Sequence, residues 1–270
     1  MSEHSGKIGV GGRLGSAIKQ QLRLFFIALQ FFTRLPIPHW VGFEESWLQQ
    51  AIRYFPSIGW IVAAVTWSVY WLASLVWPPL IAVLLSVASG ILLTGAFHED
   101  GFADFCDGFG GGTSAERVLD IMKDSRIGAY GAIGIGLLLA LKCAALVALP
   151  SHLMPAALLL AHTTSRFFAS SLIWRLDYVR VEGKAKPLAK QMTNGEFLFA
   201  ALTAIVPALA LILAGWISWE KMAAGTVLAA LATVCLARLF LRRIGGYTGD
   251  CLGAVQQAAE VVLYLGFLAR

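Results

Sequence analysis

Long apolar stretches recur along this chain and constrain its fold more than any other feature. A helix that crosses a bilayer needs about 20 mostly apolar residues. The composition agrees, because 58% of the 270 residues are hydrophobic and 14% are charged, whereas soluble domains carry about 25% charged residues. The expected spans are 57–77, 79–97, 127–149, 153–174, 197–217, 221–241 and 252–269. We therefore predict an all-α, polytopic membrane bundle with about seven transmembrane helices.

The N-terminal part differs from these stretches. Residues 1–21 are polar and Gly-rich, and we expect them to form a flexible N-terminus. Residues 22–35 are apolar but too short for a span, and a Pro-Ile-Pro follows them. We interpret them as an interfacial or re-entrant helix with Arg23 and Arg34 near the headgroups. Residues 22–270 then form a single integral-membrane domain.

The distribution of basic residues tests whether residues 22–38 span the membrane. If they do not, the longer polar segments 98–126, 175–196 and 242–250 all fall on the side of the N-terminus. That side then carries most of the 21 Lys and Arg residues, and the opposite side keeps only Lys221 and Arg270. Cytoplasmic loops carry an excess of Lys and Arg. Seven spans with these segments in the cytoplasm are therefore the favoured arrangement.

The acidic stretch HEDGFADFCDGFGGG, at 98–112, follows the second expected span. Asp100, Asp104 and Asp107 have the spacing i, i+4 and i+7, which places them on one face of a helix. Carboxylates so close together repel one another unless a cation lies between them. Oxygen ligands of this kind suit Mg²⁺ or Mn²⁺ with substrate phosphates. The alternative is a solvated acidic loop between two membrane helices.

The end of this stretch is rich in glycine. The backbone N–H groups of Gly108, Gly110 and Gly111 could approach a phosphate closely. The pattern thus predicts a metal-dependent site for phosphate chemistry at a membrane surface.

Three further polar positions are candidates for the same site. Asp124 is a further metal ligand or the partner of Lys123 or Arg126, and its spacing does not decide between these alternatives. Arg166 lies in the middle of an apolar span, where an arginine is costly unless it faces a partner or a cavity. Arg166 is therefore a candidate phosphate binder or the partner of a carboxylate, and Arg126 is a second candidate phosphate binder. Lys142, also in a span, is interpreted as snorkelling to the interface.

Asp250 lies at the start of the last expected span, among several glycines. An acid there could be a general base, a metal ligand or a helix N-cap. His98 is a second candidate for the base. No basic run is interleaved with aromatics, so we do not expect a nucleic-acid ligand. The four cysteines are scattered and imply no disulfide framework.

Four motifs together resemble the cobalamin synthase family, the adenosylcobinamide-GDP ribazoletransferases. They are FFTRLPIP at 31–38, HEDGFADFCDGFGGG at 98–112, MKDSRIGAYG at 122–131 and GGYTGDCLGA at 245–254. The resemblance runs from about residue 22 to the end. Glu99 departs from it, since an apolar residue is expected between the His and the Asp.

The resemblance implies the last assembly step of the coenzyme in a bacterial inner membrane. Adenosylcobinamide-GDP would react with α-ribazole or its 5′-phosphate, giving adenosylcobalamin or its phosphate and releasing GMP. It also implies Mg²⁺, with Asp100, Asp104, Asp107 and Asp124 as candidate ligands. The oligomeric state is left open, with a homo-oligomer among the alternatives.

Two other functions compete with this interpretation. Asp104, Asp107 and Gly108 also match the Asp-x-x-Asp-Gly core of CDP-alcohol phosphotransferases, although the downstream part of that motif is not matched. A phospholipid-type phosphotransferase is therefore one alternative. An ion-coupled transporter is the other, and it is disfavoured because its acids usually lie deep in the spans.

Overall fold

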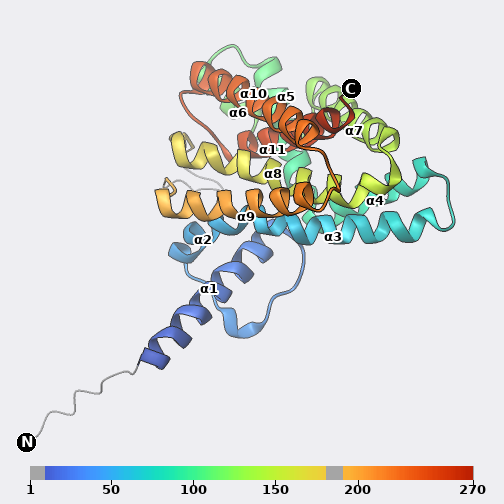
Figure 1. Cartoon of the computed structure of the whole chain (residues 1–270). Helices are drawn as coiled ribbons and strands as arrows, with labels where there is room; N and C mark the ends of the chain where they lie inside the picture. The colour runs from blue at the N-terminus through green and yellow to red at the C-terminus, as the bar shows by residue number, and fades with distance from the viewer. Residues whose placement is uncertain (1–9, 181–190, 270) are drawn as a thin grey trace, which may run out of the picture.

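The computed structural model describes residues 10–180 and 191–269, and these residues are almost entirely helical (Figure 1). The only β-type pairing in the described ranges is an isolated bridge between Tyr178 and Tyr247. The α-helices are α1 (Val10–Phe32), α2 (Glu45–Ala51), α3 (Phe55–Ser74), α4 (Pro79–Thr94), α5 (Phe97–Gly111), α6 (Ala115–Ile121), α7 (Ala129–Ala148), α8 (Met154–Arg175), α9 (Asn194–Leu213), α10 (Trp219–Ile244) and α11 (Gly249–Leu268). Single 3₁₀ turns are η1 (His39–Val41), η2 (Ile52–Tyr54) and η3 (Ser151–Leu153). The predicted all-α class is confirmed.

The last helix, α11, is the centre of the bundle. It contacts α5, α7, α8 and α10, and 78% of its most apolar 18-residue window is buried. The corresponding shares for α9 and α10 are 17% and 22%, so these two helices expose most of their apolar surface. Such a surface suits lipid rather than water. The protein is therefore a multi-pass membrane protein with α11 shielded from the bilayer by its neighbours.

Seven helices occupy the seven predicted ranges, but fewer are apolar enough to span on their own. Five stretches qualify by length and composition: Glu45–Ser74, α7, α9, α10 and α11. A sixth is obtained only if α4 and α5 are counted as one bent span. The predicted number of about seven is thus reduced to five or six by this criterion.

Helix α8 explains much of this difference. It carries His162, Arg166 and several hydroxyl side chains, which lower its apolar character. Most of its residues are nevertheless buried, because α3, α9 and α11 surround it. A helix enclosed by protein can carry polar groups that lipid would not accept. The sequence therefore identified the helix correctly, while its polar residues mark a buried site.

Helix α1 is longer than the sequence indicated. Residues 10–21, assigned to the polar N-terminus, form its first turns. Its C-terminal half buries Leu24, Ile27 and Phe32 against the bundle, whereas residues 15–18 are exposed. It is not among the helices apolar enough to span, in agreement with the prediction that residues 22–38 do not cross the membrane.

The chain turns sharply between α4 and α5. Gly95 and Ala96 both have left-handed backbone angles, with φ of 67° and 58°, and the two helices meet at 89°. The expected span 79–97 therefore ends early. Helix α5 carries four acids in 15 residues, so we treat it as part of the polar end of the bundle and not as a span.

Contacts between distant segments define this polar end. Tyr178 pairs with Tyr247, so the segment after α8 meets the segment before α11. The indole of Trp174 donates to Asn194 at the start of α9 (2.9 Å), and Arg243 of α10 donates to the carbonyl of Gly112 after α5 (2.6 Å). The described parts of the three polar segments predicted to share one side of the membrane therefore lie at the same end of the bundle.

Helices α10 and α11 cross at a pair of glycines, Gly225 and Gly266. A Cβ atom on Gly266 would overlap the backbone of Gly225. We expect Gly266→Ala to lower the free energy of unfolding by about 1–3 kcal/mol, the usual cost of overpacking. The measurement is the thermal unfolding midpoint in detergent.

The matched control is Gly136→Ala, because a Cβ atom there meets nothing within 4 Å. This variant should be neutral or up to about 1 kcal/mol more stable, since alanine favours a helix. Equal midpoints for the two variants would contradict the close crossing of α10 and α11.

Candidate active site

The acidic face predicted for residues 98–112 is present on α5, and its three aspartates lie at different depths. Asp100 is exposed, Asp104 is half-buried and Asp107 is buried. The three aspartates lie on successive turns of α5, and their burial increases towards the interface between α5 and α7. The predicted helix is confirmed, and the three carboxylates have different surroundings.

A close crossing of α5 and α11 brings a fourth acid to this face. A Cβ atom on Gly101 would lie 3.0 Å from the Cα of Asp250, and one on Gly253 would lie 2.9 Å from the carbonyl of His98. Glycines therefore allow the two backbones to touch. As a result, the charges of Asp100 and Asp250 both act on Asp104.

Burial raises the pKa of Asp104 to about 7, and the neighbouring carboxylates of Asp250 and Asp100 add to the rise. A carboxyl in such a place favours a proton or a cation. Asp250 also has a cationic partner, since Arg180 Nη2 lies 2.7 Å from its Oδ2. Thr248 caps α11 by accepting from the backbone N–H of Cys251. Asp250 is therefore free of the N-cap role that the sequence left open.

Asp107 has a structural role. Its Oδ2 accepts from the N–H of Gly128 (2.7 Å) and its Oδ1 from the N–H of Gly131 (2.8 Å). These are N–H groups at the start of α7, which no carbonyl within the helix satisfies. Each oxygen keeps a second lone pair, but the carboxylate is fixed by α7.

We expect Asp107→Asn to lower the free energy of unfolding by about 1–2 kcal/mol, because an amide accepts at one atom only and carries no charge for the helix dipole. The thermal midpoint in detergent measures the change. Asp104→Asn, on the same helix face, is the control and should not lower this midpoint. A midpoint for Asp107→Asn equal to wild type would contradict the capping role.

Asp124 and Arg126 form a surface ion pair, and both line an open pocket together with Asp107. Arg126 Nη2 lies 2.7 Å from Asp124 Oδ2, and the side chains are 86% and 41% exposed. The hydrogen bonds from Arg126 lower the pKa of Asp124 to about 2. The structure thus shows the pairing alternative for Asp124, while the metal role of Asp124 and the phosphate role of Arg126 stay predictions.

Gly108, Gly110 and Gly111, the predicted phosphate-binding glycines, lie within α5, where helical hydrogen bonds engage their backbone N–H groups. Their missing side chains make room for neighbours: a Cβ atom on Gly108 would overlap Met122, and one on Gly110 would lie 2.6 Å from the ring of Tyr130. These glycines pack α6 and the start of α7 against α5. Arg243 holds the end of α5 through the carbonyls of Phe109 and Gly112.

His98 points into the bundle and away from solvent. It is 2% exposed, and its ring stacks on Phe55 at 5.7 Å and meets Phe97 edge-on at 5.4 Å. Its Nε2 atom has no hydrogen-bond partner among the described residues. A base must reach the substrate proton, so His98 is not placed for the proposed role. Asp250 remains as the candidate.

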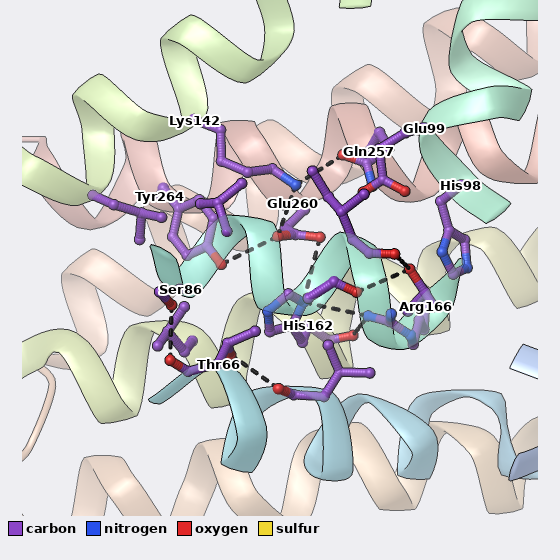
Figure 2. Close-up of a pocket in the computed structure, with 17 residues that line it drawn as sticks. Thr66, Ser86, His98, Glu99, Lys142, His162, Arg166, Gln257, Glu260 and Tyr264 are labelled. Carbon is purple, nitrogen blue, oxygen red and sulfur yellow. Dashed lines mark hydrogen bonds and ion pairs between the residues drawn. The ribbon is translucent and has the colours of Figure 1, made fainter. Parts of the chain in front are cut away.

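Arg166 is likewise inside the bundle, at 2% exposure (Figure 2). Its Nη1 donates to the carbonyl of His162 at 2.8 Å. It lines a small cavity with Glu99, Lys142, Gln257 and Glu260, and we call these five residues the buried ion network. The expected phosphate-binding role of Arg166 is therefore not supported by its position.

The interpretation of Lys142 as snorkelling is also wrong. The side chain is 5% exposed, and its Nζ lies 3.1 Å from Glu260 Oε1 and 2.8 Å from Gln257 Oε1. Sequence reasoning overlooked Glu260 and the pairing of Arg180 with Asp250. The available signal was that Lys142 and Glu260 each interrupt an apolar stretch, where an isolated charge would be costly.

No three His, Cys, Asp or Glu side chains in residues 10–180 and 191–269 are arranged as a ready metal cage. Mg²⁺ is usually held by one or two carboxylates together with substrate phosphates and water. Asp100, Asp104 and Asp250 supply such hard oxygen donors at one accessible end of the bundle. The donor chemistry therefore fits a divalent ion that binds together with a phosphorylated substrate.

Residues 24–268 match the family model described as cobalamin-5-phosphate synthase. An adenosylcobinamide-GDP ribazoletransferase of Ralstonia pickettii (strain 12J) is 45% identical over 257 residues, which cover 94% of this chain and 98% of the relative. The protein of the same name from Shewanella frigidimarina (strain NCIMB 400) is 45% identical over 259 residues, covering 93% and 95%. No solved structure gives a significant match.

Proposed function

The chain belongs to the cobalamin-5-phosphate synthase family, and on that premise we propose that it joins adenosylcobinamide-GDP to α-ribazole, or to its 5′-phosphate. The products are adenosylcobalamin, or its phosphate, and GMP. The names of the relatives support the reaction. The observation that carries the proposal for this chain is the convergence of Asp100, Asp104 and Asp250 where α5 crosses α11.

The reaction exchanges one phosphorus–oxygen bond for another. The ribazole hydroxyl oxygen bonds to the phosphorus attached to cobinamide, and the bond from that phosphorus to the GMP oxygen breaks. The hydroxyl proton moves to a base, and we propose Asp250 for this role because it lies beside Asp104 where α5 crosses α11. General-base catalysis of this kind contributes about 10²–10⁴-fold. Arg180, paired with Asp250, is in reach of developing negative charge at the same place.

We propose that Asp100 and Asp104 hold Mg²⁺, with Asp107 contributing a spare lone pair while it caps α7. When bound, Mg²⁺ neutralises the diphosphate and the charge on the leaving oxygen. Without a cation, the aspartates of this site would repel the substrate. Their arrangement at a polar end, beside membrane helices, suits a substrate that is both bulky and amphiphilic.

We further propose a bacterial inner-membrane location with this end in the cytoplasm. Lys221 lies at the opposite end, and Lys142 and Arg166 lie in the interior, but most other basic residues of the described ranges lie at this end, which the positive-inside rule assigns to the cytoplasm. They include Arg53, Arg126, Arg175, Arg180 and Arg243. An alkaline phosphatase fused to the C-terminus, at the far end of α11, should then be active. An inactive fusion would contradict this orientation and indicate the opposite one.

The experiment that tests the reaction is reconstitution with purified components. Protein in detergent or vesicles is mixed with Mg²⁺, adenosylcobinamide-GDP and α-ribazole, and GMP and cobalamin are quantified. We expect both products in equal amounts, and none after chelation of the metal. CMP release from a CDP-activated lipid, or ion flux without GMP release, would support the competing functions instead.

A further inference from the structure

The buried ion network begins on α5 and runs through the interior of the bundle (Figure 2). Gln257 Nε2 donates to Glu99 Oε1 at 2.8 Å, and Lys142 Nζ donates to Gln257 Oε1 at 2.8 Å. Lys142 is also 3.1 Å from Glu260 Oε1. The first turn of α5 is thereby connected to α11 and α7 by polar contacts that are shielded from solvent.

Glu260 is the most highly coordinated group of the network. It accepts from Gln256 at 2.7 Å and from the Tyr264 hydroxyl at 3.2 Å, and His162 Nδ1 lies 3.4 Å from its Oε2. Arg166 joins the same group through the carbonyl of His162. Helix α8 is therefore part of the network as well.

The charges in this interior balance. Glu99 and Glu260 carry negative charge, and Lys142 and Arg166 carry positive charge. A buried charge that loses its counter-charge is strongly destabilising. Each acid in the network is therefore stable only where its partners lie. The network thus fixes the positions of the helices that carry these residues, in addition to stabilising the fold.

Helix α5 needs such a constraint. The bend at Gly95 and Ala96 joins it to α4 at 89° without a continuous helix, so contacts must set its direction. Close packing does not fill the region beneath its first turn, because a cavity of about 20 Å³ remains there. That volume accommodates about one water molecule. Backbone packing at Gly101 and Gly253 sets how close α5 lies to α11, and the hydrogen bond from Gln257 to Glu99 Oε1 is the polar contact of this turn towards the interior.

Glu99 directly precedes Asp100 and lies one turn and a residue before Asp104. A shift of the first turn would therefore move both aspartates relative to Asp250, whose backbone Gly101 already touches. We propose that Glu99 is a positioning residue: through the buried ion network it fixes the direction of α5 and holds Asp100 and Asp104 against Asp250. The catalytic part of this proposal rests on the proposed function.

The test uses Glu99→Gln, which keeps an acceptor for Gln257 but removes the charge. We expect kcat to fall about 10–100-fold, the scale of a misplacement near 1 Å, while KM changes less than about threefold. Hydrogen exchange of the peptide 97–111 should become faster.

Two further variants keep the experiment decisive. Gln257→Met removes the two hydrogen bonds that link Glu99 to Lys142 but retains all four charges. It therefore tests the proposal if Glu99→Gln does not fold. Glu196→Gln removes an equally paired acid, 2.7 Å from Arg53, and should leave kcat and the exchange of 97–111 unchanged.

Wild-type exchange of 97–111 in Glu99→Gln and Gln257→Met would overturn the proposal. Loss of kcat without faster exchange would also overturn it, because Glu99 would then act on the substrate directly. If the wild-type protein shows no GMP release, the proposed function fails, while the exchange measurements still decide whether Glu99 positions α5.

Discussion

Asp104→Asn is expected to reduce GMP release by at least about 10³-fold while the protein remains folded. The carboxylate of Asp104 is the half-buried one of the three on the acidic face of α5, and it interacts with both Asp100 and Asp250. Removing one charge-stabilising group from a reaction centre costs about this factor. Steady-state release of GMP at saturating Mg²⁺ measures the loss.

The thermal stability of Asp104→Asn should not fall together with its activity. Asp104→Asn removes a repulsion with Asp100 and Asp250, so the thermal midpoint should stay the same or rise when no metal is present. The control is Glu196→Gln, which likewise replaces a carboxylate by an amide, in a pair with Arg53, and it should retain nearly full activity. Near-normal turnover of Asp104→Asn would refute the metal assignment, and an unfolded variant would refute the idea that Asp104 is kept for function.

The sequence was sufficient for the helices because their signals are local. Apolar length placed the seven helices, and the spacing of Asp100, Asp104 and Asp107 placed three acids on one face of α5. Neither signal depends on what packs against the helix. The end of α4 was misplaced by a few residues because a turn at Gly95 and Ala96 requires left-handed angles that apolar length does not report.

Roles that depend on packing partners could not be obtained in this way. Spacing cannot show that Asp107 meets the start of α7, or that Asp124 turns back to Arg126. The glycines after Asp107 predicted that another group lies close to the backbone of α5, and side chains do lie close to it there. The group that approaches Gly110 is the Tyr130 ring and not a phosphate, a distinction that only the packing of α7 on α5 provides.

The interior charges illustrate the same limit. Lys142 alone fits a snorkelling residue, and Arg166 alone fits a phosphate binder. Both interpretations change in the fold, because Glu260 lies next to Lys142 of α7 and His162 of α8. Pairing of unlike charges from separate apolar stretches is a hypothesis that sequence can raise, but only the fold shows which charges meet.

Glu260→Leu should be the most destabilising single substitution considered for this chain. Glu260 is 2% exposed and has contacts with Lys142, His162 and Tyr264. Its removal leaves Lys142 buried without its carboxylate partner, and breaking a buried pair from one side costs about 3–5 kcal/mol. We expect a marked fall in the thermal midpoint in detergent.

The double variant Lys142→Met/Glu260→Leu separates charge imbalance from lost packing. Replacing both members of a buried pair by apolar residues is often neutral or stabilising, so the double variant should be clearly more stable than Glu260→Leu alone. Contacting residues are expected to be non-additive in this way. If the double loss equals the sum of the single losses, the two charges do not stabilise each other. The interior would then be held by packing, and the charge balance that positions α5 would have no energetic basis.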